Sequence, residues 1–400
     1  MSISGAGVLP TFRVKYEGAD IIDYRNPHTS VSRDKVVDSL LPREVCACAI
    51  GRAIDARDGT VMRHCMRPET IAKIAQGYGH GHDHDHDHSH DHSHDHDHGH
   101  DDSFETLRTL MARTHCTDEK CVLDTAAREH AISLEDAGIE EQIAFKRAGP
   151  TDTSLFNDSV IHAQMFAWMY QFAPFWAYNF NMLDYATSSM RNGRVVRKPD
   201  TLATVNWRDL YEGRAQLPPG ISDDAAQSAA SAMIKSKRAN GVRCTGCIIN
   251  GDVYDGNGKH WMALFADARD EGTRDRAPSW TIEFFNSAAV RPESEWLVWM
   301  AKTKREMLEI NPRAQVSYVY VCKLWHQHST SECGPYSLFY VWARLNGVSP
   351  QYFLENPVPD QIMFEFRQHL FARDDTGGAR AFNFQEYKSR VRIKWDAEKI

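Results

Sequence analysis

Residues 327–347, QHSTSECGPYSLFYVWARLNG, join a polar segment to an apolar run of helical length. The run from Pro335 to Leu345 predicts a buried helix, and Gly347 is typical of the position just after a helix end. Pro335 fits the first turn, because the backbone N–H that proline lacks has no helical partner there. Cys333 is therefore expected at the N-terminus of this helix.

A cysteine in that position is a candidate nucleophile. Unpaired backbone N–H groups and the positive end of the helix dipole favour the thiolate. An ordinary thiol has a pKa of about 8.5, and lowering it by about three units takes roughly 4 kcal/mol, more than a helix end supplies. We therefore expect a histidine beside Cys333 that lowers the pKa of the thiol further and acts as its general base.

Two segments upstream provide such a partner and its support. A helix is predicted at 158–170, followed by strands at 242–249, 261–266, 280–285 and 316–321, an alternation that indicates an α+β fold. His260 stands at the start of the second strand and Asn286 at the end of the third, where its amide is placed to hold the imidazole ring. Glu283 is the rival, but it points to the opposite face of its strand, which favours Asn286.

Gln327 precedes the cysteine by six residues. Its amide, with the backbone N–H of Cys333, is placed to stabilise the oxyanion of a tetrahedral intermediate. Each signal is weak alone, since a cysteine before a helix is usually a small buried hydrophobe. The order His260, Asn286, Gln327 and Cys333 together predicts a papain-like cysteine peptidase.

The same segments resemble a known family. GKHWMALFADAR (258–269), WTIEFFNSA (280–288) and HQHSTSECGPYSLFYVWARLNGVS (326–349) are similar to the polyprotein-processing SUMO-type cysteine proteases of African swine fever virus and related large DNA viruses, in the superfamily of SUMO peptidases and the adenovirus proteinase. The resemblance implies a papain-like SUMO-peptidase-type core with a helical N-terminal arm. It also implies His260, Asn286 and Cys333 as the catalytic triad and Gln327 as the oxyanion-stabilising residue.

By this resemblance the protein cleaves viral structural polyproteins after Gly-Gly during virion maturation, in the host cytoplasm at assembly sites and in the virion. A Gly-Gly site needs a narrow passage, because only glycine lets a backbone lie between close walls. Trp261, next to the histidine, is expected to form one wall and contact substrate. Two alternatives remain open: a SUMO or ubiquitin deconjugating isopeptidase, and an inactive scaffold or metal-binding protein.

Composition divides the chain into five segments. They are 1–78, an N-terminal region of unclear fold; 79–102, a disordered His/Asp-rich tract; 103–150, a helical arm; 151–373, the catalytic domain; and 374–400, a C-terminal extension. The tract holds eleven of the twenty histidines and nothing apolar beyond its glycines, so it is expected to be disordered. Alternating residues such as His80, His82, His84, His86 and His88 offer weak, exchangeable metal chelation, and neither a firm metal site nor a cofactor is expected.

Two parts of the chain have no counterpart in the family. One is most of residues 1–100, and the other is a polar insertion, DEGTRDRAP (270–278), between the strands that carry His260 and Asn286. We expect the insertion to be a surface loop, with substrate contact as the alternative. A helical segment is also predicted over 133–145, and a shorter one over 70–76.

Charge and cysteine content narrow the function classes. The formal net charge is −8, and the eight aspartates between Asp83 and Asp102 account for all of it, so no basic surface for nucleic acid is expected. The most apolar stretch, 166–185, is broken by proline, asparagine and aspartate, which argues against membrane insertion. Nine cysteines without a secretory signal favour reduced, packed thiols over disulfides. A zinc site built from Cys116, Cys121, Cys244 and Cys247 is the less favoured alternative, because the spacing is irregular.

The chain also contains a Gly-Gly pair of its own. Gly377-Gly378-Ala379 follows a polar stretch just beyond the family resemblance, which covers roughly residues 116–372. Self-cleavage after Gly378 is therefore a hypothesis, and an ordinary glycine linker is the alternative.

Overall fold

The structure is a computed structural model. It describes residues 40–41, 47–50, 64–79, 102–133, 136–178, 181–186, 189–191, 194–196, 202–203, 205–214, 237, 239, 241–253 and 256–372. The chelating histidines of the tract and the Gly377-Gly378 pair lie outside these residues, so both hypotheses stay predictions.

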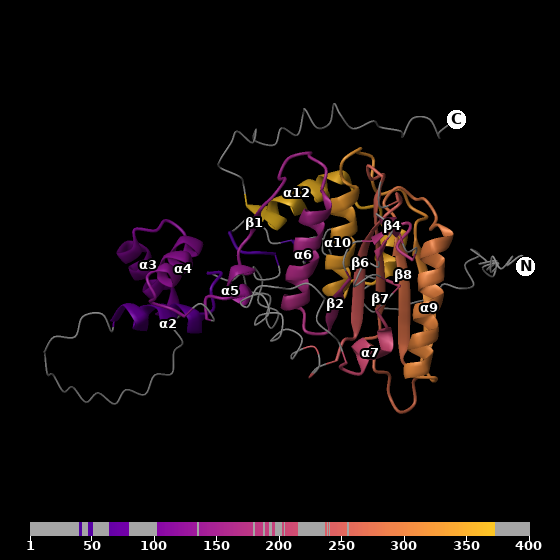
Figure 1. Cartoon of the computed structure of the whole chain (residues 1–400), viewed down its shortest axis with the longest axis horizontal. Helices are drawn as coiled ribbons and strands as arrows, with labels where there is room; N and C mark the ends of the chain where they lie inside the picture. The colour runs from indigo at the N-terminus through magenta and orange to yellow at the C-terminus, as the bar shows by residue number, and fades with distance from the viewer. Residues whose placement is uncertain are drawn as a thin grey trace, which may run out of the picture.

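A six-stranded sheet forms the centre of the larger of two packed regions, which we call the main unit (described residues 149–372) (Figure 1). The strands are β2 (Phe175–Ala177), β3 (Asn181–Met182), β6 (Cys244–Asn250), β7 (Trp261–Asp267), β8 (Ser279–Phe285) and β9 (Gln315–Val321). β2 and β3 pair in parallel with β6, the β6–β7 and β7–β8 pairs are antiparallel, and β9 is parallel to β8. The four long strands occur close to their predicted bounds.

Helices cover both faces of this sheet. α10 (Cys333–Leu345) packs on β6 and β7, whereas α9 (Ser294–Ile310) packs on β8 and β9, and the two helices stand on opposite sides of the strands in Figure 1. Every residue of β6 is buried, as expected for a strand covered from both sides. The remaining elements are α6 (Asp158–Gln171), α7 (Trp207–Tyr211), α11 (Pro350–Glu355), α12 (Asp360–Leu370) and the hairpin of β4 (Ser189–Arg191) with β5 (Arg194–Val196).

The second region, the arm (Cys48 and described residues 64–148), has its own small hydrophobic core. Its helices are α2 (Pro68–Gly79), α3 (Asp102–Thr114), α4 (Glu119–Arg128) and α5 (Ile139–Gln142). Ile71 and Ile74 of α2 share this core with Leu107 and Leu110 of α3. The packing of the arm therefore combines residues from both sides of the His/Asp-rich tract, and the expected division between 1–78 and 103–150 does not follow the core.

The predicted helix over 133–145 is wrong in extent, since α5 is the only helix among the described residues of this stretch. Ser133 Oγ accepts a hydrogen bond from the backbone N–H of Asp136 at 3.0 Å and donates one to its carboxylate at 2.9 Å. Such local side-chain bonds stabilise a turn in competition with helix. The predicted helix over 70–76 is confirmed as part of α2.

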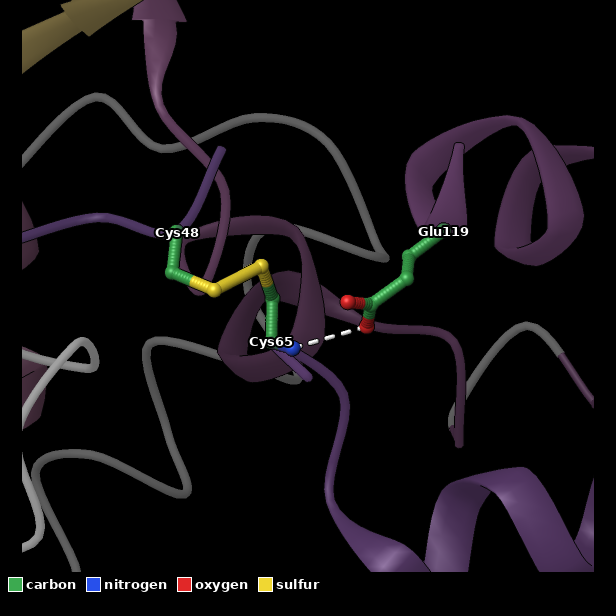
Figure 2. Close-up of side chains that lie close together, drawn as sticks. All are labelled: Cys48, Cys65 and Glu119. Carbon is green, nitrogen blue, oxygen red and sulfur yellow. Dashed lines mark hydrogen bonds between the residues drawn. A yellow bond between two sulfur atoms is a disulfide. The ribbon is translucent and has the colours of Figure 1, made fainter. Parts of the chain in front are cut away.

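Four cysteines of the arm form two disulfides, Cys48–Cys65 and Cys116–Cys121. The expectation of reduced thiols is therefore wrong for these residues. The arm core is small, and a small core gains from covalent cross-links that a large one does not need. Figure 2 shows the first bridge beside Glu119, whose carboxylate accepts the backbone N–H of Cys65 at 2.7 Å.

A short parallel pair connects the two regions. β1 (Arg147–Ala148) lies beside β10 (Phe371–Ala372), so the end of the arm is fixed to the last described strand of the main unit. Every described helix is too short or too polar to cross a bilayer.

Candidate active site

The register of β7 and β8 brings two of the predicted site residues together. His260 immediately precedes β7, Asn286 immediately follows β8, and Ala263 pairs with Phe285 across the two strands. Cys333 begins α10, the helix that packs on β7. Three segments separated in sequence therefore meet at one end of the sheet.

The imidazole of His260 is held by the amide of Asn286. His260 Nε2 and Asn286 Oδ1 are 2.9 Å apart, and the same oxygen accepts the backbone N–H of Ala288 at 2.9 Å. Because Oδ1 is fixed as an acceptor by the Ala288 N–H, His260 Nε2 must be the donor. The other ring nitrogen, Nδ1, then carries a lone pair that can accept a proton.

Glu283 has a structural role instead. Its side chain is fully buried, and its carboxylate accepts hydrogen bonds from Arg344 at 2.8 and 2.9 Å and from the Tyr340 hydroxyl at 2.7 Å. All of its partners come from the α10 side of the strand or from Thr281. The strand-face argument that favoured Asn286 as the partner of His260 therefore agrees with the geometry.

His260 and Cys333 line the same pocket, which has a volume of about 400 Å³. Its walls also include Phe156, Trp261 and Met182. Cys333 is only 7% exposed, so a reacting atom must enter the pocket to reach the sulfur.

Burial sets the resting protonation of this pair. It raises the pKa of the Cys333 thiol, although the backbone N–H groups of Trp261 and Gly334 act in the opposite direction. Burial also lowers the pKa of His260, against the Asn286 hydrogen bond and the charge of Glu293, which raise it. The expected lowering of the thiol pKa is thus wrong for the resting structure. A neutral thiol beside a neutral imidazole is the arrangement that suits general-base chemistry.

Gln327 is placed near the site but turned to other partners. Its Nε2 donates to the carbonyl of Ser329 at 3.0 Å, and its Oε1 accepts the Ser287 hydroxyl at 2.8 Å. Gln327 is not among the described residues that line the pocket. Its oxyanion role stays a prediction that requires the second N–H of the amide to face the substrate.

Trp261 forms part of the pocket wall. Its indole Nε1 donates to the carbonyl of Phe156 at 3.0 Å, which fixes the ring against the segment before α6. Asn157, in the same wall, caps α6 by accepting the backbone N–H of Val160 at 2.9 Å. This capping role and a place in the pocket are therefore compatible.

The polar insertion 270–278 lies at the far end of the sheet from His260 and Asn286. It connects the end of β7 to the start of β8, whereas the two site residues flank the opposite ends of those seven-residue strands. Seven residues of strand span about 20 Å. Asp270 ties the loop together by accepting from Arg276 at 2.6 Å. The predicted surface loop thus fits the geometry, and substrate contact by this loop stays the alternative.

The zinc site considered as the less favoured alternative is contradicted by the described cysteines. Cys116 and Cys121 are bonded to one another, while Cys244 and Cys247 are separate buried thiols of β6. In the arm, Cys48, Cys65 and Glu119 offer ligand atoms within 4.8 Å of one another, but the two sulfurs are joined in a disulfide.

Two residues near the site were missed. Asn250 lines the pocket, and its Oδ1 accepts the backbone N–H groups of Asp252 and Lys259 at 3.0 Å, which closes the loop ahead of His260. Glu332, next to the nucleophile candidate, is completely buried. The sequence offered one signal for Glu332, namely that an acidic residue stands directly before a predicted apolar helix.

Comparison with known proteins agrees with this geometry. The profile of the Ulp1 protease family, C-terminal catalytic domain, matches residues 237–380. The chain is 31% identical over 261 residues to the SUMO-1 cysteine protease of an African swine fever virus isolate from Kenya, a match that covers 64% of this chain and 83% of that protein. The corresponding cysteine protease of an isolate from Malawi is also 31% identical, over 263 residues, with the same coverage of both chains.

A solved structure shows the same fold. The crystal structure of the African swine fever virus protease superposes with a TM-score of 0.51 and 23% identity, covering 83% of this chain and 98% of that one. The expected α+β peptidase fold is confirmed. Together with the sequence identity to the viral enzymes, this shows that the chain is a cysteine peptidase of the Ulp1 family and belongs with the African swine fever virus proteases.

Proposed function

We propose that the protein is an endopeptidase that cleaves viral structural polyproteins after Gly-Gly, with Cys333 as nucleophile and His260 as general base. The observation that best supports this proposal is the 2.9 Å hydrogen bond between His260 Nε2 and Asn286 Oδ1. It fixes the tautomer that leaves Nδ1 able to accept a proton, on a ring that shares its pocket with Cys333.

The reaction follows from these groups. Nδ1 of His260 takes the thiol proton as the Cys333 sulfur attacks the scissile carbonyl carbon, and the carbonyl oxygen takes up the negative charge. The backbone N–H of Cys333 and the amide of Gln327 stabilise this oxyanion. Collapse expels the amine, which takes the proton from His260, and leaves a thioester. Water, deprotonated by the same imidazole, then hydrolyses the thioester and restores the thiol.

Preference for Gly-Gly rests on the shape of the pocket. Trp261 and Phe156 are joined by a hydrogen bond and both line the pocket with Cys333. Aromatic walls fixed in this way leave room for a backbone without side chains, which only glycine provides. Substitution of Trp261 by alanine should therefore relax selectivity for glycine more than it lowers turnover of the Gly-Gly substrate.

Peptides that span Gly-Gly junctions of viral polyproteins test this proposal, with matched peptides carrying Ala-Ala as controls. We expect cleavage after the second glycine and at least a tenfold lower kcat/KM for Ala-Ala, a difference of about 1.4 kcal/mol in the transition state. Equal rates on both peptides would remove the specificity claim while leaving the peptidase assignment in place.

A second candidate is deconjugation of SUMO-like modifiers. The name of the Kenyan relative, SUMO-1 cysteine protease, favours it. Isopeptide and peptide bonds after Gly-Gly require the same site chemistry. Incubation with SUMO and ubiquitin chains separates the candidates, because a maturation endopeptidase should prefer the polyprotein peptides.

The proposal extends to where the enzyme acts and to cleavage of its own chain. By similarity to the viral relatives, the enzyme acts at virus assembly sites in the host cytoplasm and in the virion. Its own Gly377-Gly378-Ala379 sequence is a candidate substrate. Intact mass of the wild type and Cys333→Ala, aged side by side, decides this point, because only the active chain would lose residues 379–400.

A further inference from the structure

Glu332, the residue before Cys333, forms a fully buried ion pair with Arg367 of α12. Arg367 Nε donates to one carboxylate oxygen at 2.8 Å and Nη2 donates to the other at 2.9 Å, a two-pronged contact. Both side chains are 0% exposed. Such a pair fixes geometry more firmly than a surface salt bridge, because neither partner can exchange with water.

The same guanidinium holds the wall of the pocket. Its Nη1 donates to the carbonyls of Pro150 at 3.1 Å and Ser154 at 3.0 Å, and its carbon lies 4.4 Å from the centre of the Phe156 ring. Phe156 in turn accepts the indole N–H of Trp261 through its carbonyl. One arginine therefore joins the residue before the sulfur to the segment that lines the pocket.

The wall and the helix of Cys333 touch without an intervening side chain. A Cβ placed on Gly334 would lie 2.9 Å from the Cβ of Phe156, closer than ordinary contact. A shift of the segment 150–156 would thus be transmitted directly to the first turn of α10. Arg367 is the group that holds both sides of this contact.

The pair also controls charge beside the sulfur. The negative charge of Glu332 raises the pKa of the Cys333 thiol, and Arg367 lies against that charge. Burial raises the pKa of Glu332, the charge of Arg367 lowers it, and the charge of Asp360 raises it. Asp152 lies within the field of Arg367. His260 lines the same pocket as Cys333.

We propose that Arg367 is a positioning residue for the reaction, which sets Cys333 against the Phe156–Trp261 wall and balances the charge of Glu332. The inference rests on the proposed role of Cys333 as nucleophile. Nothing in the reaction requires Arg367 to touch substrate, because its donors are occupied by protein groups.

The charge component is tested by Glu332→Gln in the full-length protein. The rate of Cys333 alkylation by iodoacetamide is measured against pH, with the modified peptide quantified by mass spectrometry. Loss of the negative charge removes the buried counterion of Arg367 beside the sulfur, so the midpoint should fall by about one pH unit or more. The matched control is Glu283→Gln, which also removes a fully buried carboxylate from an arginine, but on β8, where its partner Arg344 lies near the other end of α10 from Cys333.

The positioning component is tested by Arg367→Lys, which keeps the charge and loses the two-pronged contact. We expect kcat/KM on the Gly-Gly peptide to fall by about 100-fold, mostly through kcat, as a misplaced nucleophile requires. The control is Arg344→Lys, which loses the equivalent contact with Glu283 near the other end of α10 and should stay close to wild type. Melting temperatures of all variants show that loss of fold does not produce the result.

Three outcomes overturn the inference: an unchanged or raised alkylation midpoint in Glu332→Gln, an equal shift in Glu283→Gln, or an equal loss of activity in the two lysine variants. Alkylation needs no substrate, so it still tests the charge balance if Gly-Gly cleavage is never observed. Failure of the proposed function appears elsewhere, as peptidase activity that survives Cys333→Ala.

Discussion

The arm and the main unit are stabilised in different ways. The arm has a small core and carries both described disulfides. The main unit has a much larger core, contains two buried carboxylate–arginine pairs, and has no disulfide among its four described cysteines. A large core tolerates buried charges when they are paired, whereas a small one depends on covalent links.

The difference has a chemical consequence. The other three described thiols of the main unit, Cys244, Cys247 and Cys322, are buried, and both described disulfides lie in the arm. The nucleophile is therefore kept apart from the oxidised pairs. The two regions meet at the β1–β10 pair and at Lys146, which donates to the carbonyl of Gln368 on α12 at 2.7 Å.

The largest loss of activity is expected from substitutions at the catalytic pair of the main unit, which no substitution in the arm should match. Cys333→Ala and Cys333→Ser should each lower kcat/KM by at least roughly 10⁴-fold, because neither side chain supplies the sulfur electron pair. His260→Ala should lower kcat/KM by a similar factor. Peptide cleavage is the measurement, with the melting temperature as control. Appreciable turnover by Cys333→Ala would overturn the site assignment.

Asn286→Ala should cause a smaller loss, about 100-fold in kcat/KM. The imidazole loses its 2.9 Å hydrogen bond but can still reach the sulfur in a fraction of molecules. Cleavage of the same peptide provides the comparison with His260→Ala. If the two losses are equal, Asn286 does more than orient the ring.

The acid limb of the pH profile provides a test within the main unit. His260 must be unprotonated to act as base, and burial lowers its pKa below the ordinary value of about 6.5. Activity should therefore persist below that pH and fall only as His260 becomes protonated. Asn286→Ala removes a bond that raises the pKa of His260, so its acid limb should move to still lower pH. A limb that moves upward would contradict the assigned tautomer.

Removing the Cys48–Cys65 bridge tests whether the arm is stabilised independently. The double variant Cys48→Ala/Cys65→Ala loses a link between residues 17 apart, which corresponds to about 3 kcal/mol of arm stability. Hydrogen exchange in α2 to α4 should rise sharply while β6 to β8 stay protected. A matched loss of protection in the sheet would show that the two regions unfold as one.

The smallest effect is expected from the tract between α2 and α3. Replacing residues 80–101 by a Gly-Ser linker of equal length should leave kcat/KM within about twofold of wild type, since a polar tract contributes no packing. Weak Ni²⁺ or Zn²⁺ binding, measured by calorimetry, should disappear with the histidines. A collapse of activity would show that the tract or its metal belongs to the working enzyme.

Sequence by itself determined the elements that carry the site. The apolar run after Cys333 specifies a buried helix, and the strands that precede Asn286 and follow His260 show the expected apolar content, because local patterns reflect burial over a few residues. The choice of Asn286 over Glu283 also followed from strand alternation alone. The family motifs fixed the order of the four site residues.

Tertiary structure decided what joins distant parts of the chain. The Glu332–Arg367 pair links residues 35 positions apart, and the bridge between Cys48 and Cys65 depends on how the arm folds back on itself. The resting pKa of Cys333 is also a tertiary property: helix position predicts a lowered value, but burial in the folded protein raises it. Such contacts escape sequence reasoning because the free energy of burying a charge or a thiol depends on every group around it, and those neighbours are assembled only when the chain folds.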